Sequence, residues 1–249
     1  MCLLFKKNKI FQNLQKITFI GTFNFALEAA KAKIKSFVLI STDKAVRPTN
    51  VMGASKRMAE ISIQAINKAY KDTKLSMVRF GNVINSSGSV IPVFLDQISR
   101  GGPITLTDKD VVRYFMTIPE ASNLVIQAGE MSEGGEVFIL DMGEQMKVYD
   151  IAKRLIHLSG RSIAESSDSE GIEIVEVGLR EGEKMFEELL ISGNEEKTTN
   201  SKIFKSNEEF INLDELNDVV KQFEEMIITD NFFEITKIMS NHVEGFVYE

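Results

Sequence analysis

The sequence has one cysteine, two histidines and no tryptophan in its 249 residues. A lone cysteine, Cys2, excludes an internal disulfide, and His157 and His242 are too few for a histidine-built metal site. No apolar run approaches the ~20 residues that a membrane-spanning helix needs, and the apolar residues at 1–5 are too few for the core of a signal peptide. These absences predict a soluble, cytoplasmic chain with no metal and no membrane segment.

Positive charge is also in deficit. The chain has 29 Lys and Arg against 36 Asp and Glu, a net charge of -7 and a pI near 5.1. Nucleic acids and anionic membranes attract basic proteins, so this balance argues against both as general partners, although it is compatible with a local anion pocket. The 43% of hydrophobic residues is enough for a packed core and excludes a disordered chain. On a scale of ~150 residues per domain, the length fits one large domain, or a domain with a smaller lobe.

Apolar residues alternate between helical spacing and short continuous runs. Helical spacing over 23–34 precedes an unbroken apolar run at 37–40, and a second helix over about 52–70 precedes a strand at 75–84. Further expected elements are a short helical stretch at 92–98, a helix over 119–127, a strand at 136–142, a helix at 148–156, a strand at 172–177 and one or two helices within 214–241. Such alternation predicts an α/β fold with a largely parallel sheet.

The sequence contains no two glycines separated by a single residue. A Gly-x-Gly turn lets backbone N–H groups approach the pyrophosphate of a dinucleotide, because glycine has no side chain to hold the ligand away. The usual dinucleotide-binding loop is therefore absent from these 249 residues.

Polar residues follow the apolar run at 37–40. Thr42, Asp43 and Lys44 stand at its expected carboxyl end, where open α/β sheets bind their ligands. A carboxyl group beside an amine suits an elimination: the acid protonates a departing hydroxyl while the amine removes a proton from the neighbouring carbon. Adjacent Asp and Lys are also common in solvated turns, which is the more frequent explanation for the pair taken alone.

Met52 and Lys56 lie one helical turn apart, and Met52 also fits a core position.

The segment 37–60, FVLISTDKAVRPTNVMGASKRMAE, resembles the active-site segment of the nucleotide-sugar 4,6-dehydratases. These enzymes belong to the extended short-chain dehydrogenase family, here in its CapD-like polysaccharide-biosynthesis branch. Met52 stands where other relatives have a tyrosine. Several retaining members of the branch also have a methionine at this place. Family-like strings continue at 79–83, 88–94, 104–107, 112–116 and 179–184, so the resemblance covers about 17–220.

The resemblance implies a truncated NAD(P)-binding Rossmann-like parallel sheet with a smaller α/β substrate-binding lobe. The glycine-rich first half of the fold is missing, so we expect the carboxyl-terminal part of such a protein, with impaired NAD binding because the pyrophosphate loses its backbone donors. The expected division has an atypical basic segment at 1–16 and Rossmann-like parts at 17–84 and 115–142. The substrate-binding lobe and the C-terminal helices are expected within 85–114 and 143–249.

By the same resemblance, UDP-N-acetylglucosamine would be oxidised at C4 by NAD, lose water across C5 and C6, and receive the hydride at C6. Thr42 would hydrogen-bond the C4 oxygen, Asp43 would be the acid at the C6 hydroxyl, and Lys44 would be the base at C5. Met52 would line the site and Lys56 would orient the nicotinamide ribose. The other cofactor contacts implied are Phe80 and Val83, and the substrate contacts are Asn82, Ser89, Val90, Thr105, Arg113, Arg180 and Glu183. Guanidinium groups such as those of Arg113 and Arg180 suit phosphate oxygens.

Three other interpretations stay open. The chain could be a non-catalytic UDP-sugar-binding or assembly module, or an incomplete product that does not fold alone because a strand edge is left unpaired. It could also be a nucleotide-sugar epimerase, which the sequence favours less because epimerases need no Asp–Lys pair beside the threonine. The resemblance further implies a homo-oligomer as a possible assembly, and a membrane anchor in some full-length relatives.

Overall fold

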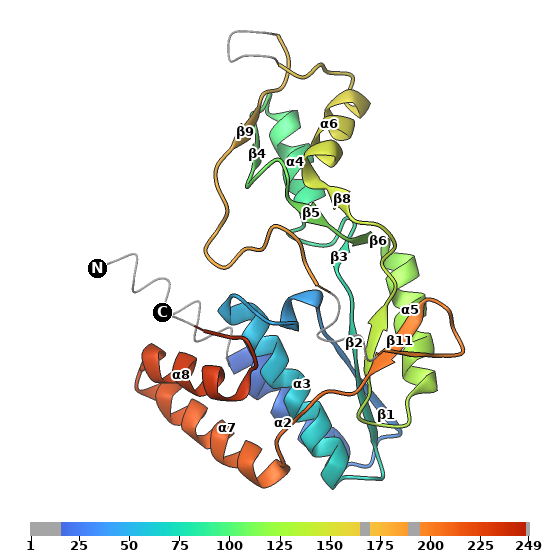
Figure 1. Ribbon diagram of the computed structural model, residues 1–249, viewed down its shortest axis with the longest axis vertical. Helices are drawn as coiled ribbons and strands as arrows, with labels where there is room; N and C mark the ends of the chain where they lie inside the picture. Colours follow the sequence, from blue (N-terminus) through green and yellow to red (C-terminus); the bar gives the residue numbers. More distant parts are fainter. Residues whose placement is uncertain (1–15, 165–169, 189–194, 248–249) are drawn as a thin grey trace. The chain divides into compact units, whose positions relative to one another are not determined.

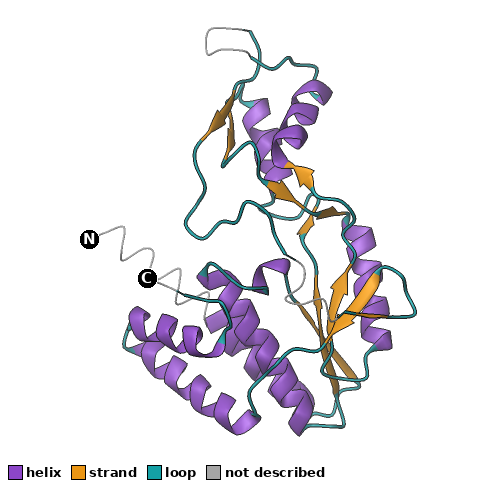
Figure 2. Cartoon of the chain, viewed as in Figure 1, coloured by secondary structure: helices purple, strands orange, loops and turns teal. Residues whose placement is uncertain are grey.

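The computed structural model describes residues 16–164, 170–188 and 195–247, and the chain divides into two compact units (Figure 1). The first unit contains the described parts of 1–80, 124–141 and 188–249, and the second contains those of 81–123 and 142–187. Each unit combines helices with short strands (Figure 2). The expected basic segment lies outside the described residues except for Lys16.

A five-stranded sheet in the order β1-β2-β7-β11-β10 forms the centre of the first unit. Its parallel strands are β1 (Ser36–Ile40), β2 (Lys74–Arg79) and β7 (Val137–Leu140), to which β11 (Ile203–Ser206) and β10 (Glu196–Lys197) add in antiparallel fashion. The predicted α/β class with a largely parallel sheet is therefore confirmed. The strand expected at 75–84 is wrong in one respect: the ladder stops at Arg79, and β3 (Asn82–Val83) pairs in the second unit.

Side chains of the sheet alternate between two helical layers, as the pleat requires. Leu39 and Met77 point into a core shared with α2 (Thr22–Lys31) and α3 (Val51–Ala69). Val38, one position along β1, faces Gly129 of α5 (Ile118–Met131) on the opposite side. A π-helix, η1 (Lys16–Gly21), leads into α2. The sheet of the first unit is thus covered on both faces.

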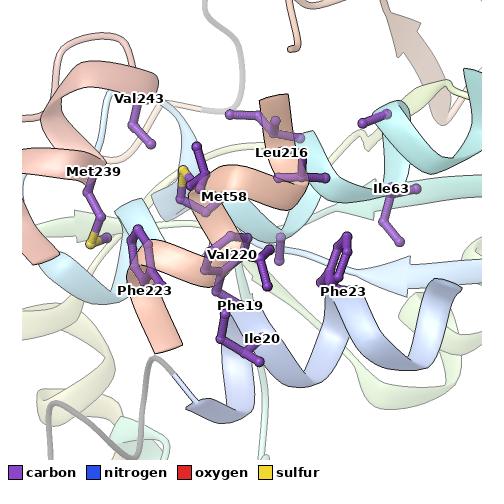
Figure 3. Packing of buried hydrophobic residues seen from close by; sticks show 14 of the residues in the cluster. Phe19, Ile20, Phe23, Met58, Ile63, Leu216, Val220, Phe223, Met239 and Val243 are labelled. Carbon is purple, nitrogen blue, oxygen red and sulfur yellow. The ribbon is translucent and has the colours of Figure 1, made fainter. Parts of the chain in front are cut away.

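Two C-terminal helices, α7 (Leu213–Ile228) and α8 (Phe232–His242), form a hairpin against α3 (Figure 1). Their apolar side chains join those of η1, α2 and α3 in one cluster, part of which Figure 3 shows: Phe19, Phe23, Met58, Leu216, Val220, Phe223 and Met239. Both helices belong to the first unit, where their apolar stripe is buried against α3.

Phe223 is the aromatic centre of this packing. It is fully buried, and its ring lies edge-on to that of Phe19 with centroids 4.9 Å apart. We expect Phe223→Ala to lower the free energy of unfolding by about 3–5 kcal/mol in urea titrations, because it empties a closed core site. Phe233 of α8 is 71% exposed, so Phe233→Ala is the matched control and should change stability by less than about 0.5 kcal/mol. Equal losses in the two variants would contradict the packing of α7.

The second unit has its own small core. Helices α4 (Val90–Ser99) and α6 (Val148–Leu158) lie against one another and contact β4 (Ile104–Leu106), which pairs with β9 (Ile174–Glu176) in parallel. Two further pairs are β3 with β6 (Phe115–Met116), parallel, and β5 (Val112–Arg113) with β8 (Met146–Lys147), antiparallel. The core residues include Phe94, Ile98, Ile104, Val148, Ile156 and Ile172.

Candidate functional site

The carboxyl end of β1 leads directly into a short 3-10 turn, η2 (Asp43–Ala45). The hydroxyl of Thr42 accepts a hydrogen bond from the backbone N–H of Lys44 at 3.4 Å and so caps the turn. The N–H of Asp43 donates to the carbonyl of Phe80 at 3.2 Å, just beyond the end of β2. The turn is therefore attached to two neighbouring strand ends, as the sequence predicts for residues that follow parallel strands.

The carboxylate of Asp43 is 1% exposed. Its Oδ1 accepts hydrogen bonds from the hydroxyl of Thr42 at 2.8 Å and from the ammonium of Lys44 at 2.9 Å. Its Oδ2 is buried and has no hydrogen-bond partner within the part of the chain that the structure describes. A buried polar atom without a partner is costly, so this oxygen marks the turn as a candidate site.

The first turns of α3 lie against this turn. Asn50 caps the helix by accepting from the N–H of Gly53 at 3.0 Å, and the α-carbon of Gly53 sits directly beside the carbonyl oxygen of Lys44. Lys56 reaches back along the sheet, and its ammonium donates to the carbonyl of Ile40, the last residue of β1, at 3.1 Å. Burial lowers the pKa of Lys56, and the nearby carboxylate of Glu60 opposes that shift.

The structure thus brings Thr42, Asp43, Lys44 and Lys56 to one end of β1. Met52 is half-buried in the first turn of α3, on the same helix as Lys56, and Phe80 is half-buried at the end of β2. All six residues belong to the first unit.

Behind these residues lies a buried ion cluster that sequence reasoning missed. Arg79 at the end of β2 donates from Nε to Glu60 at 2.7 Å and from Nη2 to Glu208 at 2.8 Å. Arg57, one position after Lys56, contacts the same two carboxylates at 3.1 and 2.9 Å. Ser41 completes the cluster, because its hydroxyl donates to Glu60 at 2.6 Å. Glu60 and Arg57 lie on a helix whose buried face is predicted to be apolar. Charged residues on such a helix are the one sequence signal that could have pointed to the cluster.

The arginines decide the ionisation of Glu60. Burial by itself would raise the pKa of this carboxyl group, but Arg79, Arg57 and the hydroxyl of Ser41 together hold its pKa below the usual value. The cluster therefore keeps Glu60 as a carboxylate in the interior of the first unit.

The remaining predicted residues lie in the second unit. Arg113 is 7% exposed and donates to Glu183 at 3.1 Å and to the carbonyls of Val112 and Met185. Glu183 also accepts from the hydroxyl of Thr107 at 3.3 Å and from the backbone N–H of Arg180 at 3.2 Å, while the side chain of Arg180 lies in an exposed loop. Two residues predicted as separate substrate contacts, Arg113 and Glu183, therefore pair with each other.

The other predicted contacts occupy strand and helix ends of the second unit. Asn82 and Val83 form β3, and Val90 opens α4. Ser89 precedes this helix, and its buried hydroxyl oxygen finds no hydrogen-bond partner among the described residues. The hydroxyl of Thr105 is already engaged, since it accepts from the side chain of Gln97 at 2.8 Å.

Open hollows lie elsewhere on the first unit. One of about 450 Å³ and one of about 310 Å³ lie where the end of α5 meets the β10–β11 hairpin, and neither is lined by a predicted site residue. The end of β1, in contrast, has a buried carboxylate oxygen without a hydrogen-bond partner among the described residues, and it is the candidate site. In the described residues no three His, Cys, Asp or Glu side chains gather as a metal site, and no helix is both long and apolar enough to cross a membrane.

Comparisons with known proteins agree with the family resemblance. The family model described as "Polysaccharide biosynthesis protein" matches residues 8–208. Capsular polysaccharide biosynthesis protein CapD of Staphylococcus aureus is 54% identical over 171 residues, which are 69% of this chain and 28% of that protein. A UDP-glucose 4-epimerase of Rickettsia canadensis is 35% identical over 175 residues, 70% of this chain and 48% of that protein. The chain thus spans less than half the length of either relative.

Solved structures show the same fold. Pen from Bacillus thuringiensis matches with a TM-score of 0.68 and 32% identity, covering 82% of this chain and 67% of that one. A dTDP-glucose 4,6-dehydratase of Bacillus anthracis, solved in complex with NAD, matches with a TM-score of 0.55 and 18% identity over 67% of this chain and 58% of that one. At that identity the second likeness shows the Rossmann-like fold alone.

Proposed function

Since the chain belongs to the polysaccharide biosynthesis protein family, in the CapD-like branch of the extended short-chain dehydrogenases, we propose that it carries the acid/base part of a nucleotide-sugar 4,6-dehydratase site acting on UDP-N-acetylglucosamine. The observation that carries this proposal is the carboxylate of Asp43. One of its oxygens is held by Thr42 and Lys44, and the other is buried without a partner in the described chain.

Each member of the turn has a role in the proposed elimination. Thr42 hydrogen-bonds the C4 oxygen of the sugar. Lys44 first passes its ammonium proton to the carboxylate of Asp43, to which it is hydrogen-bonded, and as a neutral amine it then removes the proton from C5. The protonated Asp43 delivers its proton to the C6 hydroxyl, so that the C6–O bond breaks and water leaves. Met52 has no proton to exchange and lines the site. The family resemblance assigns the contacts to the UDP-sugar to residues of the second unit: Asn82, Ser89, Val90, Thr105, Arg113, Arg180 and Glu183.

The cofactor fits these residues in part. When bound, NAD would take a hydride from C4 and return it to C6. Lys56 would hold the nicotinamide ribose, and Phe80 and Val83 would contribute further cofactor contacts. In this chain the ammonium of Lys56 donates to the carbonyl of Ile40. No Gly-x-Gly turn for the pyrophosphate occurs in the sequence. The proton transfers are therefore the part of the cycle that these residues perform.

The direct test is incubation of the chain with UDP-N-acetylglucosamine and excess NAD, followed by mass spectrometry. A product lighter by one water would show that the chain still uses NAD, and Asp43→Asn and Lys44→Ala should then each slow its formation by about 10²- to 10⁴-fold, the usual contribution of a positioned acid or base. Lys35→Ala, which changes an exposed lysine just before β1, is the matched control and should leave the rate unchanged.

A second arm removes the need for hydride transfer. In D₂O, Lys44 should exchange the C5 proton of a UDP-4-keto-6-deoxy sugar, because that proton lies next to the ketone and its removal requires no cofactor. Deuterium uptake is followed by NMR, with Lys44→Ala and the sugar without protein as comparisons. A native chain that binds the sugar nucleotide but exchanges no C5 proton would refute the role of Lys44 and favour a non-catalytic binding module.

The competing function is a nucleotide-sugar 4-epimerase, which the 35% identity to the Rickettsia canadensis protein favours. An epimerase inverts C4 and releases a product of unchanged mass. Conversion to an isomer, with no loss of water, would therefore select the epimerase.

A further inference from the structure

We propose that Glu208 is a positioning residue for the Thr42–Lys44 turn and for Lys56, acting through the buried ion cluster of Arg57, Arg79 and Glu60. The expected effect of Glu208 on turnover rests on the proposed function, whereas its expected effect on the position of the turn and of Lys56 does not. Glu208 lies far along the chain, between the end of β11 and the start of α7, and no motif in the sequence points to it.

The segment that carries Glu208 is fastened to α3 by side chain and backbone alike. The carboxylate of Glu208 is 8% exposed and contacts Arg57 at 2.9 Å, and both terminal nitrogens of Arg79 donate to it. The carbonyl of Glu208 accepts from Gln64 at 3.3 Å, and that of Glu209 accepts from Arg57 at 2.8 Å. A strand end, a helix and a C-terminal segment therefore meet at one carboxylate.

Charge balance makes Glu208 necessary to the cluster. Two guanidinium groups, Arg57 and Arg79, face two carboxylates, Glu60 and Glu208, so the buried cluster is neutral. Without the charge of Glu208, both arginines depend on Glu60 alone, and one buried positive charge is uncompensated. The arginines must then rearrange around Glu60 or draw water into the site.

Such a rearrangement reaches the site through direct contacts. Glu60 holds the hydroxyl of Ser41, the residue before Thr42, and it lies one helical turn beyond Lys56 on α3. Arg79 immediately precedes Phe80, whose carbonyl holds the N–H of Asp43. Any movement of Glu60 or Arg79 therefore displaces the turn and Lys56 relative to one another.

The test compares Glu208→Gln, which keeps the shape and removes the charge, with Glu209→Gln, the exposed neighbour whose side chain takes no part in the cluster. In ¹H–¹⁵N spectra of the full chain, we expect the amide signals of 41–44 and of Lys56 to shift in Glu208→Gln and to stay in place in Glu209→Gln. The melting temperature should fall by roughly 5–15 °C in the first variant alone. In turnover of UDP-N-acetylglucosamine, kcat should fall about 10- to 100-fold with KM changed by less than about twofold.

A lower melting temperature with unmoved signals at 41–44 and Lys56 would overturn the proposal, because Glu208 would then only fasten the C-terminal segment. Unchanged stability and unchanged spectra would overturn it as well. If Glu208→Gln does not fold, Glu208→Asp, which keeps the charge and shortens the side chain, is judged by the same amide signals. Shifted signals in a chain with no turnover would support the positioning role and count against the proposed function, so the two failures are distinguishable.

Discussion

Replacing Gly53 by alanine is expected to displace the Asp43–Lys44 turn and to lower turnover of the sugar nucleotide by about 100-fold or more. A β-carbon at this position would lie 2.1 Å from the carbonyl oxygen of Lys44 and 2.9 Å from the β-carbon of Pro48. Neither atom is the end of a flexible side chain, so the backbone of the turn or of α3 must move. Because Thr42, Asp43 and Lys44 act from that turn, their geometry is lost with it.

Helix propensity makes this test sharper. Alanine is more favourable than glycine inside a helix by about 1 kcal/mol, so Gly53→Ala would stabilise α3 if there were room. We expect a net loss of about 1–3 kcal/mol in urea unfolding, the usual cost of overpacking. The control is Gly21→Ala, where the added β-carbon meets the carbonyl of Lys16 at 3.2 Å, and it should change stability by less than about 1 kcal/mol. A Gly53→Ala chain as stable and active as the native one would refute the close contact between α3 and the turn.

Local periodicity predicted the elements that carry the proposed chemistry. The apolar run at 37–40 is β1, and the helical pattern over about 52–70 is α3. The placement of Thr42, Asp43 and Lys44 at a strand end followed from where that run stops. These features depend on neighbours in the chain, which is why a sequence pattern can indicate them.

Contacts between distant segments were not predictable in this way. Glu208 meets Arg79 across 129 positions, and the pairing of Arg113 with Glu183 spans 70. Periodicity tells which face of a helix is buried but not what covers it, so the packing of α7 and α8 on α3 could not be predicted from the sequence. A buried charge looks like a surface charge in the sequence until its partner is known.

Arg79→Met is expected to be among the most destabilising single changes in the chain. Arg79 is fully buried and holds both Glu60 and Glu208. Methionine fills much of the volume but leaves two buried carboxylates with Arg57 as their shared partner, and breaking a buried ion pair costs about 3–5 kcal/mol. Arg100 is the matched control: it is 74% exposed and pairs with Asp96 at 2.9 Å, so Arg100→Met should cost no more than about 0.5 kcal/mol in the same urea titration.

The pH dependence of that loss identifies its source. In the native chain the folded pKa of Glu60 lies below its ordinary value of 4.5, so the stability that Glu60 contributes is present above that pH and is lost as the pH falls through the folded pKa. In Arg79→Met the burial remains and the strongest opposing charge is gone, so the folded pKa of Glu60 rises. A protonated Glu60 needs no cation, and the cost of the substitution should therefore be largest at pH 7 and shrink as the pH is lowered toward 5. An equal cost at both pH values would show that the loss comes from packing around residue 79 and not from the stranded carboxylate.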